Sequence, residues 1–400
     1  MLLPERIVEQ LQNKRARFRA YDGDYQKELA AYKSALTELS QYDAAALHDK
    51  LSAHEAPGAL PTDEFNAALA LPFAHTFAHH EAARAWAHEA LLGHTTIAAD
   101  GSQILPNADL NIPVAAVQAA WFVNPHEPAG QYEKNLTVEI LAPDELLLAY
   151  EGEVKISEQV VNHKRFELEV TTLCRLMRAW REANSPEAPL PVVFFDSSLV
   201  ISFVEQLHQQ TRTHYLNALR ELLRCSAETR VPVVGYVDSS HARDLTTMLA
   251  CAFDLQAATR SHDAQLLNAA LDHWGRRTPY FICARGSSRG IQQSVLEQLG
   301  EEFRRALGFV YLKTNSNAPA RLEIPRWVYD AGLLESVVNL VRGEVIVGNG
   351  YPYALETADA TAVLSGRDRE TFNEIFRRFA ESEGLALRLT QKAASKARRR

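Results

Sequence analysis

Three aspartates follow three apolar runs in this sequence. Asp100, Asp196 and Asp238 each end such a run and are each followed by a small residue and a serine, as DGS, DSS and DSS. The runs are rich in β-branched residues, which predicts three buried strands that end at these aspartates, and Gly101 permits a sharp turn after the first. Parallel strands of an open α/β sheet present their carboxyl ends at one edge, where such sheets place their sites. We therefore expect these side chains to converge there.

The chemistry of such a cluster is that of a divalent cation. Carboxylates within a few ångströms of one another raise one another's pKa unless a counter-charge is present. Ligands that are all oxygen favour Mg²⁺ or Mn²⁺, and paired ions of this kind stabilise the attacking and leaving oxygens of a phosphodiester. The alternative is that each aspartate only caps the helix that follows it, because Asp and Ser side chains commonly accept hydrogen bonds from helix N-terminal amides.

A further carboxylate lies on the helix predicted over residues 157–182. Glu169 falls within the apolar stripe of this helix, and Glu167 lies beside the stripe. A carboxylate among core-facing residues needs a partner. Glu169 either reaches the edge that holds the aspartates or pairs with Arg165, four residues earlier on the same face. The choice between Glu167 and Glu169 as the helix ligand stays open.

A late loop carries two more candidates. Residues 348–353, with the sequence GNGYPY, predict a loop before another helix. Tyr351 in this loop and Asp359 on the helix are expected to approach one site together. The alternative is a surface loop whose acidic neighbours only favour the N-terminus of the helix.

The elements that position these residues follow the order β-β-β-α-β-α-β-α. Three strands with short links come first, and helices and strands then alternate. The strands are predicted at 95–100, 112–122, 135–141, 190–196 and 231–238, and the helices at 157–182, 199–225 and 242–253. This is the order of a ribonuclease H-like mixed α/β sheet, in which the first strand pairs beside the fourth. An N-terminal helical arm precedes the sheet, and helices follow it.

Composition excludes several classes of protein. The chain has 400 residues, a formal net charge of −8 and four scattered cysteines, which indicate neither a zinc knuckle nor a disulfide framework. We expect no signal peptide and no membrane span, and therefore a cytoplasmic protein. The acidic balance disfavours broad electrostatic binding of nucleic acid, so DNA contacts must come from local basic patches.

We predict three parts. Residues 1–92 form the helical arm, residues 93–385 form the domain with the mixed sheet, and residues 386–400 form a basic C-terminal tail. The arm is interpreted either as a docking or dimerisation element or as a helical layer on one face of the sheet. The tail is interpreted either as a phosphate-contacting segment or as a solvated end.

With these residues assembled, the chain resembles the NurA nuclease family. The resemblance rests on four pieces: residues 99–103 (ADGSQ), a glutamate on the helix before the second aspartate, residues 195–199 (FDSSL) and residues 350–359 (GYPYALETAD). Their order and spacing carry it. It implies a ribonuclease H-like domain, a homodimer, and a Mn²⁺-dependent (or Mg²⁺-dependent) nuclease that acts on DNA ends. The implied activities are 5′–3′ exonuclease and single-strand endonuclease, in break repair with a HerA-like hexameric ATPase.

The resemblance also implies roles for individual residues. Asp100 and Asp196 match the metal-binding aspartates of the family, Glu169 matches its helix glutamate, and Tyr351 matches its characteristic tyrosine. Asp359 stands where archaeal members have a histidine. An aspartate still binds a hard cation, but it does not replace a neutral base or a cationic phosphate contact near pH 7.

The sequence also suggests roles for two residues at the third motif and a rival function for the chain. Asp238 matches the family less closely and is retained as an outer ligand, and His241 is a hypothetical substitute for the missing imidazole. The rival is a non-catalytic adaptor that uses the same fold to dock on a ring ATPase and guide DNA. The acidic net charge, the helical arm and the histidine-to-aspartate change at Asp359 support this alternative.

Overall fold

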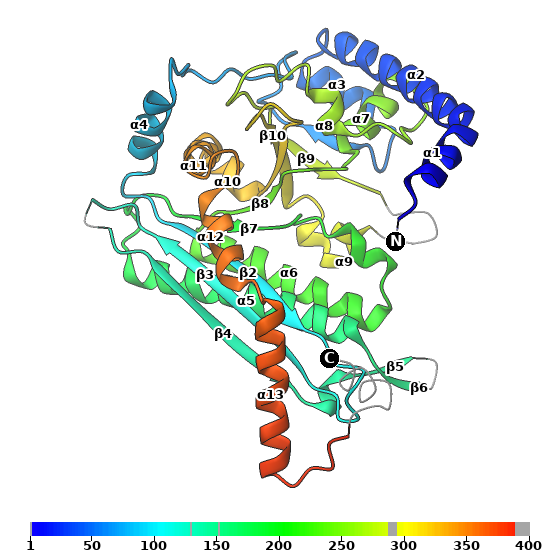
Figure 1. The fold of residues 1–400 in the computed structure, drawn as a ribbon. Coiled ribbons are helices and arrows are strands. Elements are labelled where there is room, and N and C mark those ends of the chain that lie inside the picture. Colours follow the sequence, from blue (N-terminus) through cyan, green and yellow to red (C-terminus); the bar gives the residue numbers. More distant parts are fainter. Residues whose placement is uncertain (1, 129, 151–152, 287–293, 389–400) are drawn as a thin grey trace. The chain divides into compact units, whose positions relative to one another are not determined.

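The computed structural model describes residues 2–128, 130–150, 153–286 and 294–388 (Figure 1). The chain divides into two compact units. Unit 1 contains residues 1–76 and 237–326, and unit 2 contains residues 77–236 and 327–400. The predicted arm is thus shared between the units, and the predicted limits at 92/93 and 385/386 stay predictions. Most of the predicted basic tail, 389–400, lies outside the described residues.

The sheet of unit 2 has the order β8-β7-β2-β3-β4. Strands β2 (Thr96–Ile104), β3 (Ala115–Asn124) and β4 (Glu133–Leu141) are antiparallel neighbours. Strand β7 (Val192–Phe195) runs parallel to β2, and β8 (Val233–Val237) runs parallel to β7. The first strand of this sheet therefore pairs with the fourth. The ribonuclease H-like mixed sheet predicted from the sequence is confirmed.

Helices cover both faces of this sheet. Helix α5 (Glu158–Ala183) packs on β2 and β3, and α6 (Gln209–Thr229) packs along α5. Helix α12 (Tyr353–Ala362) also packs on β2 and β3. Successive residues of a strand point to opposite faces. Gly101 faces α5, and the Ser102 hydroxyl donates a hydrogen bond to the Ala362 carbonyl at the end of α12, so the two helices lie on opposite faces.

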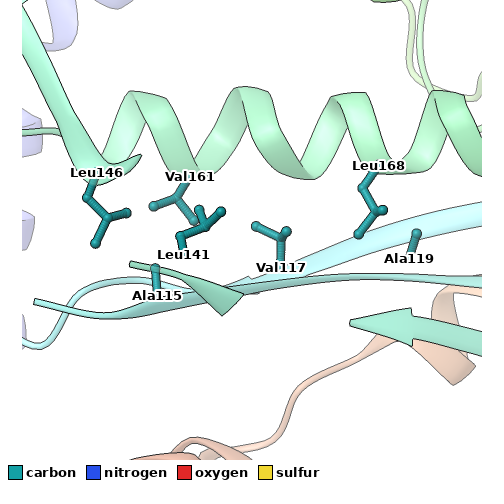
Figure 2. Close-up of a cluster of buried hydrophobic side chains, with 7 residues drawn as sticks. All are labelled: Ala115, Val117, Ala119, Leu141, Leu146, Val161 and Leu168. Carbon is teal, nitrogen blue, oxygen red and sulfur yellow. The ribbon is translucent and has the colours of Figure 1, made fainter. Parts of the chain in front are cut away.

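The contact between α5 and the sheet is apolar and closely packed. Figure 2 shows Val161 and Leu168 of α5 above Ala115, Val117 and Ala119 of β3; Leu141 of β4 and Leu146 complete the cluster. The Ser157 hydroxyl accepts a hydrogen bond from the Gln159 amide and so caps the first turn of α5. Small alanines on β3 let the helix approach closely, which fixes the distance between α5 and the sheet.

One predicted strand end is wrong. Strand β2 does not stop at Asp100 but continues to Ile104, because β3 pairs with it along its whole length, from Thr96 opposite Asn124 to Ile104 opposite Ala116. Gly101 therefore does not form a turn. Strands β7 and β8 do end immediately before their aspartates, as predicted.

The remaining elements of unit 2 include a hairpin that the sequence pattern did not predict. Strands β5 (Leu147–Tyr150) and β6 (Glu153–Ile156) pair between β4 and α5. Helix α6 begins ten residues later than predicted, after a 3₁₀ turn. The other elements are α4 (His80–Leu91), η1 (Pro143–Leu146), η2 (Ser202–Gln206), α10 (Arg326–Asp330), α11 (Leu334–Val347) and α13 (Gly366–Ser382).

Unit 1 is built around antiparallel strands in the order β1-β9-β10-β11. These are β1 (Gly58–Pro61), β9 (Phe281–Ala284), β10 (Leu307–Leu312) and β11 (Ala320–Pro325). The helices are α1 (Pro4–Asn13), α2 (Arg15–Leu39), α3 (Ala44–Leu51), α7 (Asp244–Phe253), α8 (Asp263–Leu267), α9 (Val295–Leu299) and η3 (Glu301–Phe303).

The core of unit 1 contains paired charges. Arg321 is 1% exposed, and its guanidinium lies 2.8 Å from the Asp244 carboxylate and 2.7 Å from the Glu323 carboxylate. Arg285 contacts the same Asp244 at 2.5 Å. Buried charges are tolerated when each is paired in this way, and removing one partner would leave the others uncompensated. Within the described residues, no helix has the length and apolar character needed to span a membrane.

Candidate functional site

Three of the predicted carboxylates line one cavity in unit 2. The cavity has a volume of about 350 Å³, and Asp100 of β2, Glu169 of α5 and Asp196, directly after β7, contribute to its wall. Arg165 and Phe203 also line it. We refer to it as the carboxylate cavity. The register explains why the aspartates meet, because Ala99 of β2 pairs with Phe195 of β7 and the next residue of each strand is an aspartate.

Gly101 lets α5 approach this cavity. A Cβ atom at this position would lie 2.8 Å from Arg165 Cγ and 3.2 Å from Glu169 Oε2. Arg165 Nη1 in turn donates a hydrogen bond of 3.0 Å to the Gly101 carbonyl. The sequence pattern suggested a turn at Gly101, but the structure uses this glycine to let α5 pack closely on β2. Glycines within strands often mark such close approaches.

Only one of the two candidate glutamates of α5 lines the carboxylate cavity. Glu169 is 4% exposed and lines the carboxylate cavity. Its Oε2 lies 3.6 Å from Arg165 Nη1, so both interpretations of this residue occur together in the structure. Glu167 instead contacts His214 of α6 at 2.9 Å and Lys164 at 3.1 Å. The structure therefore groups Glu169, and not Glu167, with the aspartates.

Electrostatics in the cavity disfavour three bare carboxylates. Burial raises the pKa of Glu169 to about 8; Arg165 opposes this shift, and Asp100 and Asp196 add to it. Burial also raises the pKa of Asp100 to about 6, against the hydrogen bond from the Gly101 amide. Partial burial raises the pKa of Asp196, and its hydrogen bond from Tyr351 lowers it. The cavity therefore holds too little positive charge to balance its carboxylates, which raise one another's pKa.

The late loop and α12 bring the other two candidates to Asp196. The Tyr351 hydroxyl donates a hydrogen bond of 2.5 Å to Asp196 Oδ1, and its ring packs edge-to-face on Tyr236 with centroids 5.1 Å apart. Asp359 on α12 is exposed, and its charge raises the pKa of both Asp100 and Asp196. The structure thus brings all five predicted residues close to the middle of β2 and the end of β7.

A buried glutamate that the sequence analysis missed holds this loop. Glu344 of α11 is 0% exposed and accepts hydrogen bonds from the Thr96 hydroxyl at 2.9 Å and from the Ala354 amide at 2.7 Å. It therefore links β2 to the first turn of α12, directly after the loop that carries Tyr351. The available signal was a glutamate within the run LVRGEVIV, which is apolar apart from Arg342 and this glutamate, since a carboxylate in such a run needs buried partners.

The third motif lies in the other unit. Asp238 and His241 belong to unit 1. Asp238 is exposed and contacts the Ser239 hydroxyl at 3.5 Å, and the ring of His241 packs edge-to-face on His262 with centroids 4.7 Å apart. Their predicted roles as an outer ligand and a substitute imidazole stay predictions.

The residues of the carboxylate cavity fit a hard divalent cation. All three carboxylates are oxygen donors, which Mg²⁺ and Mn²⁺ prefer, and the raised pKa values show that a positive charge there would be favourable. The trio is more open than a closed metal site, because its oxygens do not all lie within 4.8 Å of one another. Binding would therefore draw the carboxylates together.

Comparison with protein families identifies the family of this chain. The model of the NurA domain matches residues 94–364, which is more than half of the chain. The chain belongs to the NurA family. NurA is a family of nucleases, so the chain belongs to a family of hydrolases.

Other comparisons are more distant. A crystal structure of NurA with manganese is 10% identical, with a TM-score of 0.42, and the match covers 71% of this chain and 89% of that one. A second NurA crystal structure is 11% identical over 71% and 88%, with a TM-score of 0.40. The catalytic domain of human Endonuclease V is 12% identical over 75% and 89%, with a TM-score of 0.32. These similarities are too low to transfer the role of any residue. Comparison with curated proteins gives no match.

Proposed function

We propose that this NurA-family chain is a metal-dependent DNA nuclease in which Asp100, Glu169 and Asp196 bind Mn²⁺ or Mg²⁺. The observation that carries the proposal is that carboxyl groups from β2, α5 and the end of β7 line one cavity and have raised pKa values. A structural role explains this poorly, since packing alone gains nothing from gathering three carboxyl groups. Asp359 is a further ligand in this proposal.

Each side chain has a part in the hydrolysis of a phosphodiester. When bound, the cation neutralises the carboxylates, lowers the pKa of a water molecule and stabilises charge that develops on the phosphate. Tyr351 orients the Asp196 carboxylate through its hydroxyl, and Arg165 offsets part of the charge of Glu169. Glu344 is a positioning residue, because it fixes the start of α12 against β2.

The finer assignment comes from the family. We propose DNA ends as the substrate, 5′–3′ exonuclease and single-strand endonuclease activities, Mn²⁺ as the working ion, and a HerA-like hexameric ATPase as the partner of a homodimer in the cytoplasm. Membership of the NurA family supports these assignments, and manganese is named for one similar NurA crystal structure.

The direct test is cleavage of end-labelled linear DNA with and without Mn²⁺. Replacing Asp196 by Asn keeps the size of the side chain and removes its charge, so we expect Asp196→Asn to lower Mn²⁺-dependent cleavage by at least about 100-fold. Asp144→Asn is the control, because Asp144 is an exposed aspartate on η1 and is not among the residues that line the carboxylate cavity. Unchanged cleavage by purified Asp196→Asn would remove this residue from the mechanism.

A non-catalytic adaptor is the second candidate. Asp359, in place of the histidine of archaeal members, is the residue that favours it, and an adaptor would not need the carboxylates to bind metal. Calorimetric titration with Mn²⁺ separates the two, since a nuclease should lose Mn²⁺ binding at this site in Asp100→Ala. Equal titrations of the wild type and Asp100→Ala, with no cleavage by either, would favour the adaptor.

A further inference from the structure

A second group of metal-ligating side chains lies between α5 and α6. One potential ligand atom from each of His163, Glu167 and His214 lies within 4.8 Å of the other two; no other group of three or more His, Cys, Asp or Glu meets this limit among the residues that the structure describes. His163 and Glu167 are four residues apart on α5 and so share one face of that helix. His214 comes from α6, which packs along α5.

The cluster is partly buried and partly open. His163 is 4% exposed, and its Nδ1 atom is buried without a well-formed hydrogen bond to any described residue. A buried imidazole without a well-formed hydrogen bond is costly, and coordination of a metal ion by this ring would offset that cost. The side chains of Glu167 and His214 are 27% and 40% exposed, so an ion has a route to them from solvent.

The donor set differs from that of the carboxylate cavity. Two imidazole nitrogens and one carboxylate oxygen are the ligands of zinc sites that leave a fourth position for water, whereas three carboxylates favour harder ions. We propose that His163, Glu167 and His214 form a Zn²⁺ site that joins α5 to α6. The inference does not depend on the proposed nuclease activity, since none of the three residues is among those that line the carboxylate cavity in the described chain.

Position on the helix separates the two sites. Glu167 and Glu169 are two residues apart, so their side chains leave α5 about 200° apart around its axis. Glu169 points to the cavity with Asp100, and Glu167 points to His214. One helix thus presents a carboxylate to each site.

Zinc binding requires one side chain to move. The rings of His163 and His214 stack with centroids 4.3 Å apart and an angle of 6° between their planes. Lone pairs in two parallel planes do not point at one ion, so one ring must turn. His214 is the ring that turns, because it is the more exposed. The turn exchanges its 2.9 Å hydrogen bond with Glu167 for coordination, and Lys164 gives up its contact with Glu167.

The test is calorimetric titration of the metal-free, full-length protein with Zn²⁺ alone. We expect one Zn²⁺ per chain to bind at this site in the wild type and in Asp100→Ala, which removes a ligand of the carboxylate cavity. His214→Ala and Glu167→Gln should each weaken this binding by more than about 10-fold. His88→Ala is the control, because His88 is an exposed histidine on α4.

A second measurement guards against misfolding. Zn²⁺ should raise the melting temperature of the wild type and of Asp100→Ala but not that of His214→Ala, since an ion that binds only the folded state stabilises it. Circular dichroism spectra of both site variants should match the wild type, because both side chains are partly exposed. Wild-type Zn²⁺ affinity in folded His214→Ala and Glu167→Gln, or loss of all Zn²⁺ binding in Asp100→Ala, would overturn the proposal.

Discussion

Glu167 and Glu169 lie two positions apart on α5 and end in different surroundings. Glu169 is buried beside Arg165 and the two aspartates, and Glu167 is half-buried between Lys164 and His214. The difference follows from the helical repeat, because only positions on the core-facing stripe reach the sheet. Two glutamates that are close in the sequence therefore have different partners and different candidate roles.

Tyr351 should contribute to cleavage through its hydroxyl alone. Tyr351→Phe removes the hydrogen bond to Asp196 and allows the pKa of that carboxyl group to rise further. A hydrogen bond to a charged group is worth about 1.5–3 kcal/mol, so we expect cleavage to fall by at least about 10-fold. Initial rates on labelled DNA check this. Tyr353→Phe is the control, and equal rates for both variants would contradict the role.

Gly101 should be intolerant of even one methyl group. Gly101→Ala places a Cβ against Arg165 and presses on Glu169, so we expect a loss of about 1–3 kcal/mol in unfolding free energy and lower cleavage. Urea unfolding measures the first effect. Gly366→Ala is the control, because a Cβ at Gly366 meets nothing within 4 Å. Wild-type stability of Gly101→Ala would show that α5 can move away at no cost.

At the scale of elements, local patterns predicted the order of the strands and helices of the sheet but not the full length of β2 or the β5–β6 hairpin. The apolar runs and the helical stripe at 157–182 gave the order of β2, β3, β4, α5 and β7, because strand and helix periodicities are local. The extension of β2 to Ile104 was not predicted, since pairing with β3 overrides the polar residues after Asp100. The role of Glu344 was missed because it depends on Thr96, a partner distant in the sequence. The β5–β6 hairpin was missed although its pairing is local, from Leu147 opposite Ile156.

The stability of the fold should depend on pH through Glu28 of helix α2. Burial raises the pKa of this carboxyl group, but hydrogen bonds from the Thr259, Arg260 and Ser261 amides outweigh it and lower the pKa to about 2. A lowered folded-state pKa stabilises the fold above the ordinary value near 4.5, and this stability is lost as the pH falls from there toward 2.

Glu28→Gln tests this contribution. We expect the variant to be less stable than the wild type by about 1–2 kcal/mol at pH 7, and the difference to shrink as the pH falls from about 4.5 to 2. Melting temperatures across this range measure it. Glu38→Gln on the same helix is the control, because Glu38 is exposed. A difference that does not vary with pH would assign the effect to packing.

At the scale of the whole molecule, the repeated motif shows what one sequence can and cannot predict. Asp100, Asp196 and Asp238 follow similar runs, and this pattern predicted that all three converge, although the family resemblance kept Asp238 only as an outer ligand. The structure places the first two in unit 2, at one cavity, and the third in unit 1. The division of the chain into units depends on contacts between distant segments, which a local pattern does not contain.

The most direct test of the account is the position of Mn²⁺ in a crystal structure of the protein grown with that ion. Anomalous scattering from manganese locates the ion independently of the protein atoms. We expect a peak in the carboxylate cavity, coordinated by oxygens of Asp100, Glu169 and Asp196, with the three side chains closer together than in the present structure. Mn²⁺-dependent cleavage by the same preparation with no peak in this cavity would contradict the central claim.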